Sequence, residues 1–425
     1  MSSESTTVIG EEDDEMSALV PRLRFPEFRE AGEWRSQSGA VLFDQVSNKD
    51  HNSDLPVLAI TQEHGAVPRR LIDYHVSVAD KSIEGYKVVE VGDFIISLRS
   101  FQGGIEYSSY KGICSPAYVI LRLAPGYSAD YFRHFLKTDR FIGQLTKNLE
   151  GLRDGKMVSY KQFSELQLPT PSQKEQEKIA DCLSSLDELI TLETQKLDAL
   201  KTHKKGLMQQ LFPREGETAP RLRFPEFRKS GSWKSTTLAG VATIRAGTTP
   251  SRSEPAFYSG GTIPWVKTAD LNNGFISHTE ECITPAAKAR INPVGSVLVA
   301  MYGGFNQIGR TGYLTVSAAT NQAISVLTAD ENEVLPIYLL TWMNARVESW
   351  KKIASSSRKD PNITGTDVAN FPIAYPRKEE QRQISDGLAS LDDLIATQIQ
   401  KIDALKTHKK GLMQQLFPVP DKVPA

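Results

Sequence analysis

Apolar residues in two long segments recur alternately four and three positions apart. In the first segment they are Ile179, Leu183, Leu186, Ile190, Leu197, Leu200, Leu207 and Leu211. In the second they are Ile384, Leu388, Leu391, Ile395, Ile402, Leu405, Leu412 and Leu416. Polar residues interrupt both at equivalent places, Glu193 and Lys204 in one and Gln398 and Lys409 in the other. An apolar repeat of about 3.5 residues is typical of a coiled-coil seam. The pattern predicts two helices of about 39 residues, each roughly 58 Å long.

Both helix ends carry sequence signals. Ser172 and Glu175 form an S-x-x-E capping box at the first start, where Arg377 replaces the serine in the second copy. Pro213 and Pro418 end the helices, because proline lacks the backbone N–H that helical hydrogen bonding requires.

Two stretches of the chain occur twice. Lys201–Pro213 and Lys406–Pro418 both read KTHKKGLMQQLFP, and Pro21–Arg29 and Pro220–Arg228 both read PRLRFPEFR. We call these four stretches the frame. The sequence between them diverges, so two different modules stand in two copies of one frame.

Each predicted helix needs an apolar partner for its seam. The nearest is the other copy in the same chain, because tethering raises its effective concentration. We expect an antiparallel pair, which would place the modules at opposite ends of one rod. A parallel pair and pairing between two chains are the structural alternatives.

The modules, about 35–170 and 234–375, read as mixed α/β. Strand-like runs at Gly92–Ser97 and Gly295–Ala300 occupy matching places, and helical stretches follow at Tyr131–Ile142 and Ile337–Ile353. The predicted fold class is therefore α/β: two mixed α/β domains separated by two long helices that form an antiparallel coiled coil, with a pseudo-two-fold internal repeat.

Composition narrows the class of protein. Hydrophobic residues make up 40% of the 425 residues, and no apolar run approaches the roughly 18 residues of a membrane span. The net charge is −1, but residues 1–15 carry six acidic side chains and no basic one, which leaves +5 for the remainder. We expect a disordered acidic tail, a soluble cytoplasmic protein and no disulfide framework among the three cysteines.

The sequence lacks the common catalytic motifs. It contains no G-x-x-x-x-G-K-[ST] phosphate loop, no H-E-x-x-H zinc motif, no G-x-S-x-G nucleophile elbow and no Asn-Pro-Pro-aromatic or Asp-Pro-Pro-aromatic motif. We therefore predict neither a catalytic residue nor a metal site in this chain.

Polar loops supply candidate contacts to nucleic acid. Arg, Lys, Asn and Gln can bind base edges, and Ser, Thr and Tyr can bind phosphates. In the first module the candidates are Gln62, Arg69, Arg70, Arg99, Ser100, Gln102, Tyr107, Arg153 and Lys156. In the second they are Thr249, Ser251, Arg252, Lys267, Tyr302, Asn306, Arg310, Asn321, Gln322, Arg358 and Lys359. The stretch from Arg133 to Lys161 contains seven Lys or Arg and three acidic residues, an excess of positive charge that suits binding to a phosphate backbone. For any single residue, the alternative is an ordinary solvated loop.

A motif at the start of both helices resembles a known family. Pro171, Glu175, Gln176 and Ile179 fit a P-x-x-x-E-Q-x-x-I pattern, as do Pro376, Glu380, Gln381 and Ile384. Gly247–Arg252 and Ile263–Val266 are similar to the G-G-T-P-S-[KR] loop and I-P-W-[IV] strand of target-recognition domains, whereas the first module lacks that opening. Along nearly its whole length the chain resembles the specificity (S) subunits of type I restriction–modification enzymes.

The resemblance implies a domain division and a role. The parts are an acidic tail (1–19), a target-recognition domain (20–170), a spacer helix (171–215), a second target-recognition domain (216–375), a second spacer helix (376–418) and a C-terminal tail (419–425). Each recognition domain would read half of an asymmetric bipartite double-stranded DNA site. The helices would set the gap and dock two methyltransferase (M) subunits.

The cofactors that the resemblance implies belong to partners. S-adenosylmethionine would be bound by the methyltransferase subunits, and ATP and Mg by the nuclease–translocase (R) subunits that join such complexes. No cofactor is expected in this chain. The alternative from a different class is a coiled-coil scaffold whose modules bind protein partners, and an enzyme with an unrecognised active site is a third.

Overall fold

The computed structural model describes residues 19–52, 54–72, 83–147, 158–304, 306–355 and 362–418. The chain divides into two compact units: unit 1 consists of Met1–Thr194 with Lys401–Ala425, and unit 2 of Gln195–Gln400. Both predicted tails lie outside the described residues, apart from Leu19. The division passes through both long helices, so each unit contains a piece of each.

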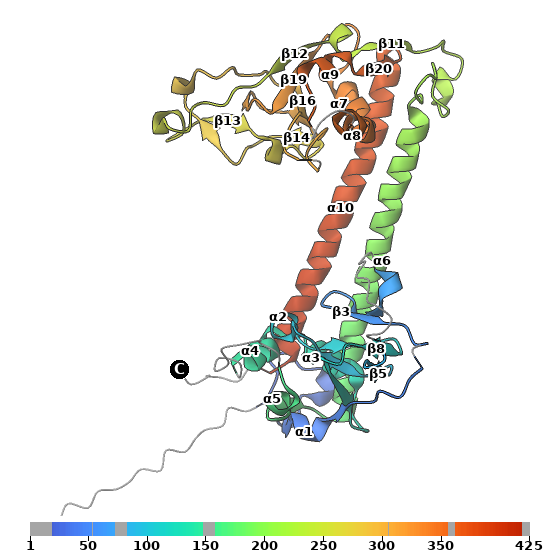
Figure 1. Cartoon of the computed structure of the whole chain (residues 1–425), viewed down its shortest axis with the longest axis vertical. Coiled ribbons are helices and arrows are strands. Elements are labelled where there is room, and N and C mark those ends of the chain that lie inside the picture. The colour runs from blue at the N-terminus through green and yellow to red at the C-terminus, as the bar shows by residue number, and fades with distance from the viewer. Residues whose placement is uncertain are drawn as a thin grey trace, which may run out of the picture. The chain divides into compact units, whose positions relative to one another are not determined.

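The two long helices are observed. They are α6 (Gln173–Leu211) and α10 (Lys378–Leu416), each 39 residues long (Figure 1). Ser172 Oγ accepts the Glu175 N–H at 3.4 Å, which is one of the two bonds of the predicted capping box. The Glu175 carboxylate accepts from Arg24 and Trp34 instead of completing the box. The twelve seam residues from Ile179 to Leu200 and from Ile384 to Leu405 are all buried or half-buried. Leu192 and Leu394, outside the seam, are 61% and 55% exposed.

Within unit 1, the first half of α6 lies against the last part of α10. Lys401 contacts Glu193 at 2.5 Å, and Lys409 contacts Asp187 at 2.6 Å. Later residues of one helix thus meet earlier residues of the other, which is the antiparallel order. Near Leu183, the α6 seam shares a core with Leu416 at the end of α10, with Phe417 directly after it and with the first module.

Unit 2 repeats this arrangement with the roles of the helices exchanged. Lys204 of α6 pairs with Asp392 of α10. Leu211 and Phe212 share a core with Ile384 and Leu388. The end of each long helix therefore packs in the module where the other helix starts.

The elements of unit 1 other than the long helices form the first module. They are β1 (Arg35–Ser38), α1 (Gly39–Leu42), β2 (Phe43–Val46), β3 (Leu58–Thr61), β4 (Gly65–Pro68), β5 (Lys87–Val89), β6 (Phe94–Ile96), α2 (Ser100–Gly103), β7 (Glu106–Tyr107), β8 (Gly112–Cys114), β9 (Val119–Leu123), α3 (Ala129–Phe135), α4 (Asp139–Lys147), α5 (Tyr160–Ser164) and β10 (Gln167–Thr170). Strands β2, β9, β6 and β7 form an antiparallel sheet in that order. The ring of Phe43 packs edge-on against Phe94, Phe132 and Phe163 and joins this sheet to helices α3 and α5.

The second module has a larger sheet. Its elements are β11 (Lys234–Thr237), β12 (Ala242–Ala246), β13 (Ile263–Val266), β14 (Gly274–Ile276), β15 (Cys282–Ile283), β16 (Val297–Ala300), β17 (Thr311–Leu314), β18 (Ala319–Thr320), β19 (Ile324–Ala329), α7 (Pro336–Asn344), α8 (Val347–Ser355), α9 (Gly365–Asn370) and β20 (Pro372–Tyr375). Five strands follow the order β12-β19-β16-β17-β14, with helices α7, α8 and α9 beside them (Figure 1). Strands β15, β13 and β18 form a second, smaller sheet.

The helical stretches expected after these sheets are each divided in two. Tyr131–Ile142 spans α3 and the start of α4, and Ile337–Ile353 spans α7 and most of α8. Thr138 causes the first break, because its Oγ1 donates to the Phe135 carbonyl and accepts the Phe141 N–H at 3.2 Å. It thereby caps the start of α4.

The Glu-Gln pair at the start of each long helix joins frame, module and helix. Arg24 donates to both oxygens of Glu175 at 2.7 and 2.8 Å, and Arg223 does the same to Glu380 at 2.6 and 2.7 Å. The neighbouring glutamine binds backbone groups in each unit, two in unit 1 and three in unit 2, where Gln381 also donates to the Glu333 carbonyl at 2.8 Å. Gln176 accepts the Ser128 N–H and donates to the Pro171 carbonyl. Gln381 accepts the Leu335 N–H and donates to the Pro376 carbonyl. The motif therefore has a structural role, because it attaches two different modules to one frame in the same way.

Candidate nucleic-acid interface

In unit 2, a loop and two strand ends bring several candidate residues together. The Thr248 N–H donates to the Thr320 carbonyl at 2.9 Å. A Cβ on Gly247 would lie 2.2 Å from the Asn321 carbonyl oxygen, so only glycine permits this approach. The Thr249 hydroxyl then bonds the Gln322 side chain. Thr249 thus meets the adjacent residues Asn321 and Gln322, although it lies 73 positions before Gln322 in the sequence.

Arg252 lies in the same loop and is held from two sides. Its guanidinium stacks 4.4 Å from the centre of the Tyr258 ring and 5.1 Å from that of Trp265. It pairs with both carboxylate oxygens of Glu281, and its side chain remains 57% exposed. The hydrogen bond from Arg252 lowers the pKa of Glu281, so this carboxylate stays ionised. The Arg252 fork is therefore fixed in one orientation at the surface.

Lys267 joins this cluster at the end of β13. Its Nζ lies 3.0 Å from Glu280 and 3.4 Å from Glu281. Ser251 is close by and its Oγ lies 2.8 Å from that of Ser253. The sequence did not predict Glu280 and Glu281, because their importance depends on pairs with Arg252 and Lys267 that only the fold creates.

A second loop of unit 2 lies beside the first. It joins β16 to β17 and closes on itself, because the Gly309 N–H donates to the Ala300 carbonyl and the Ala300 N–H to the Arg310 carbonyl. The Met301 N–H donates to the Ala323 carbonyl, which brings the loop next to Gln322. Tyr302 is 43% exposed and Asn306 is also exposed. Arg358 and Lys359 lie outside the described residues.

In unit 1, candidate residues line a cleft of about 790 Å³ between the module and both long helices. Gln62 and Tyr107 are among its walls. The charged or titratable residues that line it are Glu63, His64, Glu106, Arg133, His134, Lys137, Asp187, Lys406, Lys409 and Lys410, together with the hydroxyl of Tyr110. The lysines of α10 were not among the candidates, although their repeated sequence had marked the helix end.

The other candidates of unit 1 fall into three places. Arg69 and Arg70 follow β4, and Arg99 and Gln102 are exposed around α2. Ser100 is 1% exposed, and its Oγ accepts the Ser97 N–H at 2.9 Å. This corrects its expected place at a DNA surface, because the hydroxyl is used inside the fold. Arg153 and Lys156 lie outside the described residues.

Buried titratable groups form one wall of the cleft. His134 is 3% exposed, lies 3.2 Å from Ser184 Oγ and 3.8 Å from Asp187. Burial lowers the pKa of His134 to about 4, with the Lys409 charge as a second cause, so the ring is neutral at neutral pH. Glu106 is 2% exposed, and burial raises the pKa of its carboxyl although Lys137 lies 2.5 Å away.

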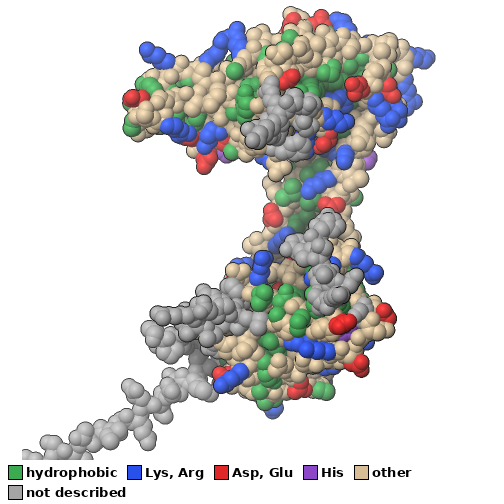
Figure 2. Space-filling model, in the orientation of Figure 1, with side chains coloured by type: hydrophobic (Ala, Val, Ile, Leu, Met, Phe, Trp, Pro, Cys, Tyr) green, Lys and Arg blue, Asp and Glu red, His purple; other side chains and the backbone are tan. Residues whose placement is uncertain are grey.

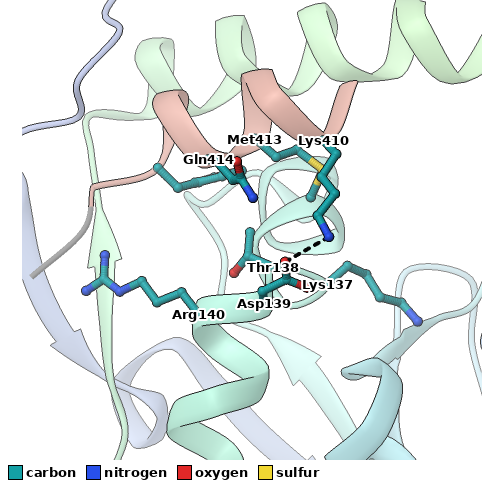
Figure 3. A pocket seen from close by; sticks show the side chains of 8 residues that line it. Lys137, Thr138, Asp139, Arg140, Lys410, Met413 and Gln414 are labelled. Carbon is teal, nitrogen blue, oxygen red and sulfur yellow. Dashed lines mark ion pairs between the residues drawn. The ribbon is translucent and has the colours of Figure 1, made fainter. Parts of the chain in front are cut away.

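A smaller cavity of about 230 Å³ lies between the start of α4 and the last turns of α10 (Figure 3). Met413 and Phe417 give it an apolar wall, and Lys410 pairs with Asp139 at 3.2 Å. Nε and Nη1 of Arg140 are buried and have no hydrogen-bond partner among the described residues. Burial lowers the pKa of Arg140 to about 10. In Figure 3 the Arg140 guanidinium points away from Lys410 and Gln414.

The surface charge is mixed. On the face in Figure 2, blue basic and red acidic side chains are interspersed on each unit. In the part of the chain that the structure describes, no three His, Cys, Asp or Glu side chains are grouped to hold a metal ion. None of the described helices is long and apolar enough to cross a membrane.

Comparison with known proteins identifies the family. A family model described as the type I restriction modification DNA specificity domain matches residues 40–202 and 231–407. The match spans most of the chain in two copies, so the chain belongs to this family.

Individual relatives agree with this assignment. The type I restriction enzyme MjaVIII specificity subunit of Methanocaldococcus jannaschii is 25% identical over 365 residues, which cover 80% of this chain and 81% of the relative. The MjaIX specificity subunit of the same organism is 26% identical over 192 residues, 44% of each chain.

Solved structures share the fold. One, from work on complex assembly and conformational transition of the type I R-M system, has a TM-score of 0.59 at 18% identity and covers 91% of this chain and 97% of its own. The type I restriction-modification system S subunit from M. genitalium has a TM-score of 0.54 at 14% identity, with 95% and 100% covered.

Proposed function

We propose that this chain is the non-catalytic DNA-recognition subunit of a type I restriction–modification complex. Each module reads one half of a bipartite double-stranded site. The observation that carries this proposal is the repeated attachment of unlike modules: Arg24 with Glu175 and Arg223 with Glu380 make the same bonds, while the loops that follow differ. Two different recognition modules attached to the same frame favour an asymmetric DNA target whose two halves have unrelated sequences.

The loop clusters have the chemistry that sequence reading needs. Thr249, Arg252, Lys267 and Gln322 offer hydrogen-bond donors and acceptors at one exposed place in unit 2. Such side chains bind base edges in the major groove and phosphates beside it. In unit 1, Gln62 and Tyr107 have the corresponding role.

The long helices act as the spacer of this reader. We infer that α6 and α10 pair as an antiparallel coiled coil along their whole length and so set the gap between the two half-sites. Two domains that read one face of a duplex must lie about one helical turn, roughly 34–36 Å, or a multiple of it apart. A helix of 39 residues is roughly 58 Å long, which suffices. The base pairs between the halves are bound only through their shape and phosphates.

The frame offers two identical surfaces for one kind of partner. The Leu23 N–H donates to the Gln415 carbonyl in unit 1, and the Leu222 N–H to the Gln210 carbonyl in unit 2. Leu23 and Leu222 remain 38% and 36% exposed. Core packing does not require identity at exposed positions, so a partner present twice accounts for it better. We assign these surfaces to two methyltransferase subunits.

The chemistry then belongs to those partners. The methyltransferase subunits bind S-adenosylmethionine and methylate adenine N6 after the base has left the stack. Nuclease–translocase subunits add ATP hydrolysis with Mg. This chain recognises the DNA sequence, sets the distance between the half-sites and carries no cofactor.

A module exchange tests the proposal. Residues 235–370 are replaced by the second module of another family member, and modified adenines are mapped in host DNA before and after. One half of the methylated site should change while the other half and the gap stay the same. A methylation pattern that does not depend on this chain, or binding by the complex that is indifferent to sequence and salt, would instead favour the protein scaffold.

A further inference from the structure

The walls of the large cleft in unit 1 come from four sources, one of which is α6, which supplies Asp187 and Thr191. Strand β7 and its neighbours supply Gln62 and Tyr107, helix α3 supplies Arg133, and the repeated end of α10 supplies Lys406 and Lys410. The cleft has a volume of about 790 Å³ and is open to solvent. It lies where the first module, with its candidate DNA contacts Gln62 and Tyr107, meets helix α10.

The acidic residues of this cleft are mostly neutralised within the protein. Lys409 lies 2.6 Å from both oxygens of Asp187. Glu106 is 2% exposed and is paired with Lys137 at 2.5 Å. Glu63, which is 85% exposed beside His64, is the most exposed of these three acidic wall residues, and Asp187 is 36% exposed.

Three cations of the cleft remain available. Lys406 is exposed and forms no ion pair with any other residue that the structure describes. Lys410 is 65% exposed and pairs at 3.2 Å with Asp139, which is itself 72% exposed. Arg133 is 44% exposed, lies 3.8 Å from Asp130 and stacks 5.3 Å from the Tyr107 ring centre. Exposed pairs of this kind contribute about 0–1 kcal/mol, so an anionic ligand can displace them.

We propose that Lys406, Lys410 and Arg133 form a seat for DNA phosphates beside the half-site that unit 1 reads. This proposal rests on the proposed function and adds a role for the spacer helix: its repeated end binds the DNA backbone as well as the other helix. Lys406 and Lys410 lie on one helical face at i and i+4, where side chains are neighbours about 5–6 Å apart at Cβ. Flexible lysines at that spacing suit adjacent charges on one strand and add affinity without reading sequence.

The frame provides a matched control. Lys201 and Lys205 occupy the same positions of the repeated segment in α6. They are exposed like Lys406 and Lys410 but do not line this cleft. The double variants K406A/K410A and K201A/K205A therefore remove the same charge from the same helical positions.

The test measures DNA binding by the complex of the full chain with its methyltransferase subunits over a series of salt concentrations. One duplex carries the methylated site and a second carries a scrambled site. K406A/K410A should lower affinity for both duplexes by a common factor of roughly ten and make the slope of log K against log salt shallower by about 2. R133A should reduce the slope by about 1, and K201A/K205A should cause less than half the effect of its counterpart.

The outcomes separate this proposal from the proposed function. Suppose that the wild-type complex prefers its site while K406A/K410A leaves affinity and slope unchanged. The proposed phosphate-binding role is then wrong, and the proposed function in DNA recognition is unaffected. An equal loss in K201A/K205A overturns the assignment to this cleft, because general charge then explains the effect. A change in the preference between the two duplexes also overturns it. A wild-type complex without any preference overturns the proposed function itself.

Discussion

Arg252 directs its guanidinium at both carboxylate oxygens of Glu281, and the ring of Tyr258 lies 4.4 Å from it. Two consequences follow for a reader of DNA. The guanidinium is oriented before DNA arrives, which reduces the entropy lost on binding. Its fork is also partly occupied, so a base must use the remaining N–H groups or replace the carboxylate.

Removal of Arg252 should weaken discrimination in one half-site. We expect R252A to cost about 1–3 kcal/mol at a single base position of the half read by unit 2, since one bidentate contact is lost. Methylation of site variants with single base changes measures this. The half read by unit 1 serves as the internal control, and equal loss in both halves would contradict the assignment.

Neutralisation of Glu281 should increase the affinity for DNA, whereas removal of Arg252 should weaken recognition. E281Q removes a negative charge near the phosphates and releases the fork of Arg252. Binding to a scrambled duplex should tighten while the preference at the Arg252 position declines. A double-mutant cycle with R252A separates the two residues, because orientation by Glu281 has no effect once Arg252 is absent. Additive changes would show that Glu281 acts independently.

The buried pair at each helix start should govern the stability of its unit. Arg24 and Glu175 are 8% and 2% exposed at the side chain, and Arg223 and Glu380 are 11% and 0% exposed. R24A or R223A leaves a buried carboxylate without its main partner, and we expect each to cost about 3–5 kcal/mol in the free energy of unfolding.

Denaturant unfolding measures this loss, and K178A is the control. Lys178 and Glu27 form a pair that is 50% and 46% exposed, so its removal should change stability by less than about 1 kcal/mol. Equal effects of R24A and K178A would show that the pair does not attach the frame. Glu175 also accepts the Trp34 indole N–H at 3.1 Å, so R24A should be the milder of the two arginine variants.

His134 should make unit 1 less stable in acid. Burial lowers its folded-state pKa to about 4, well below the ordinary value of 6.5, with Lys409, Asp187 and Arg133 as the charges that face it. Between these values the unfolded chain binds a proton that the folded chain does not, so stability falls as pH falls from 6.5 to 4. The loss attributable to His134 is about 2–3 kcal/mol.

H134Q removes this titration. Its stability should fall less than that of the wild type between about pH 7 and about pH 4.5, whatever its stability at neutral pH. Glu106 opposes the trend, because its raised pKa stabilises the folded state as pH falls, but it is common to both proteins and cancels in the comparison. Parallel pH profiles would show that His134 is not the group responsible.

The exposed frame leucines should control assembly. L23D places a charge on one of the two equivalent surfaces, and L222D places it on the other. Each variant should bind one methyltransferase subunit in place of two, and the double variant none, as mass measurements of the complex would show. Retention of both subunits in the double variant would locate the docking surface elsewhere.

The sequence predicted the long helices closely, because their 3.5-residue pattern and their proline stops are local signals. The Glu-Gln motif was found from sequence, but its structural role was not, since Arg24 lies 151 positions from Glu175. Loop candidates were found by residue type alone. That criterion included Ser100, whose hydroxyl is used inside the fold, and omitted Glu281, whose importance depends on a partner 29 positions away. The cleft escaped prediction for the same reason, because Arg133 and Lys406 meet only through tertiary packing.

The length of the helices should set the gap between half-sites. Seven residues inserted into α6 and seven into α10 at paired positions preserve the heptad pattern and lengthen an antiparallel spacer by about 10.5 Å. At about 3.4 Å per base pair, the unread gap should grow by about three base pairs while both half-sites keep their sequence. Methylation mapping reads both quantities at once. A seven-residue insertion in α6 alone makes the two helices unequal in length, so residues beyond it lose their partners across the seam. This variant should abolish methylation, and it is the control for added length without matched pairing. If the doubly extended protein methylates DNA with the original gap, the helices are not the spacer, and the distance between the modules must be set by the partner subunits.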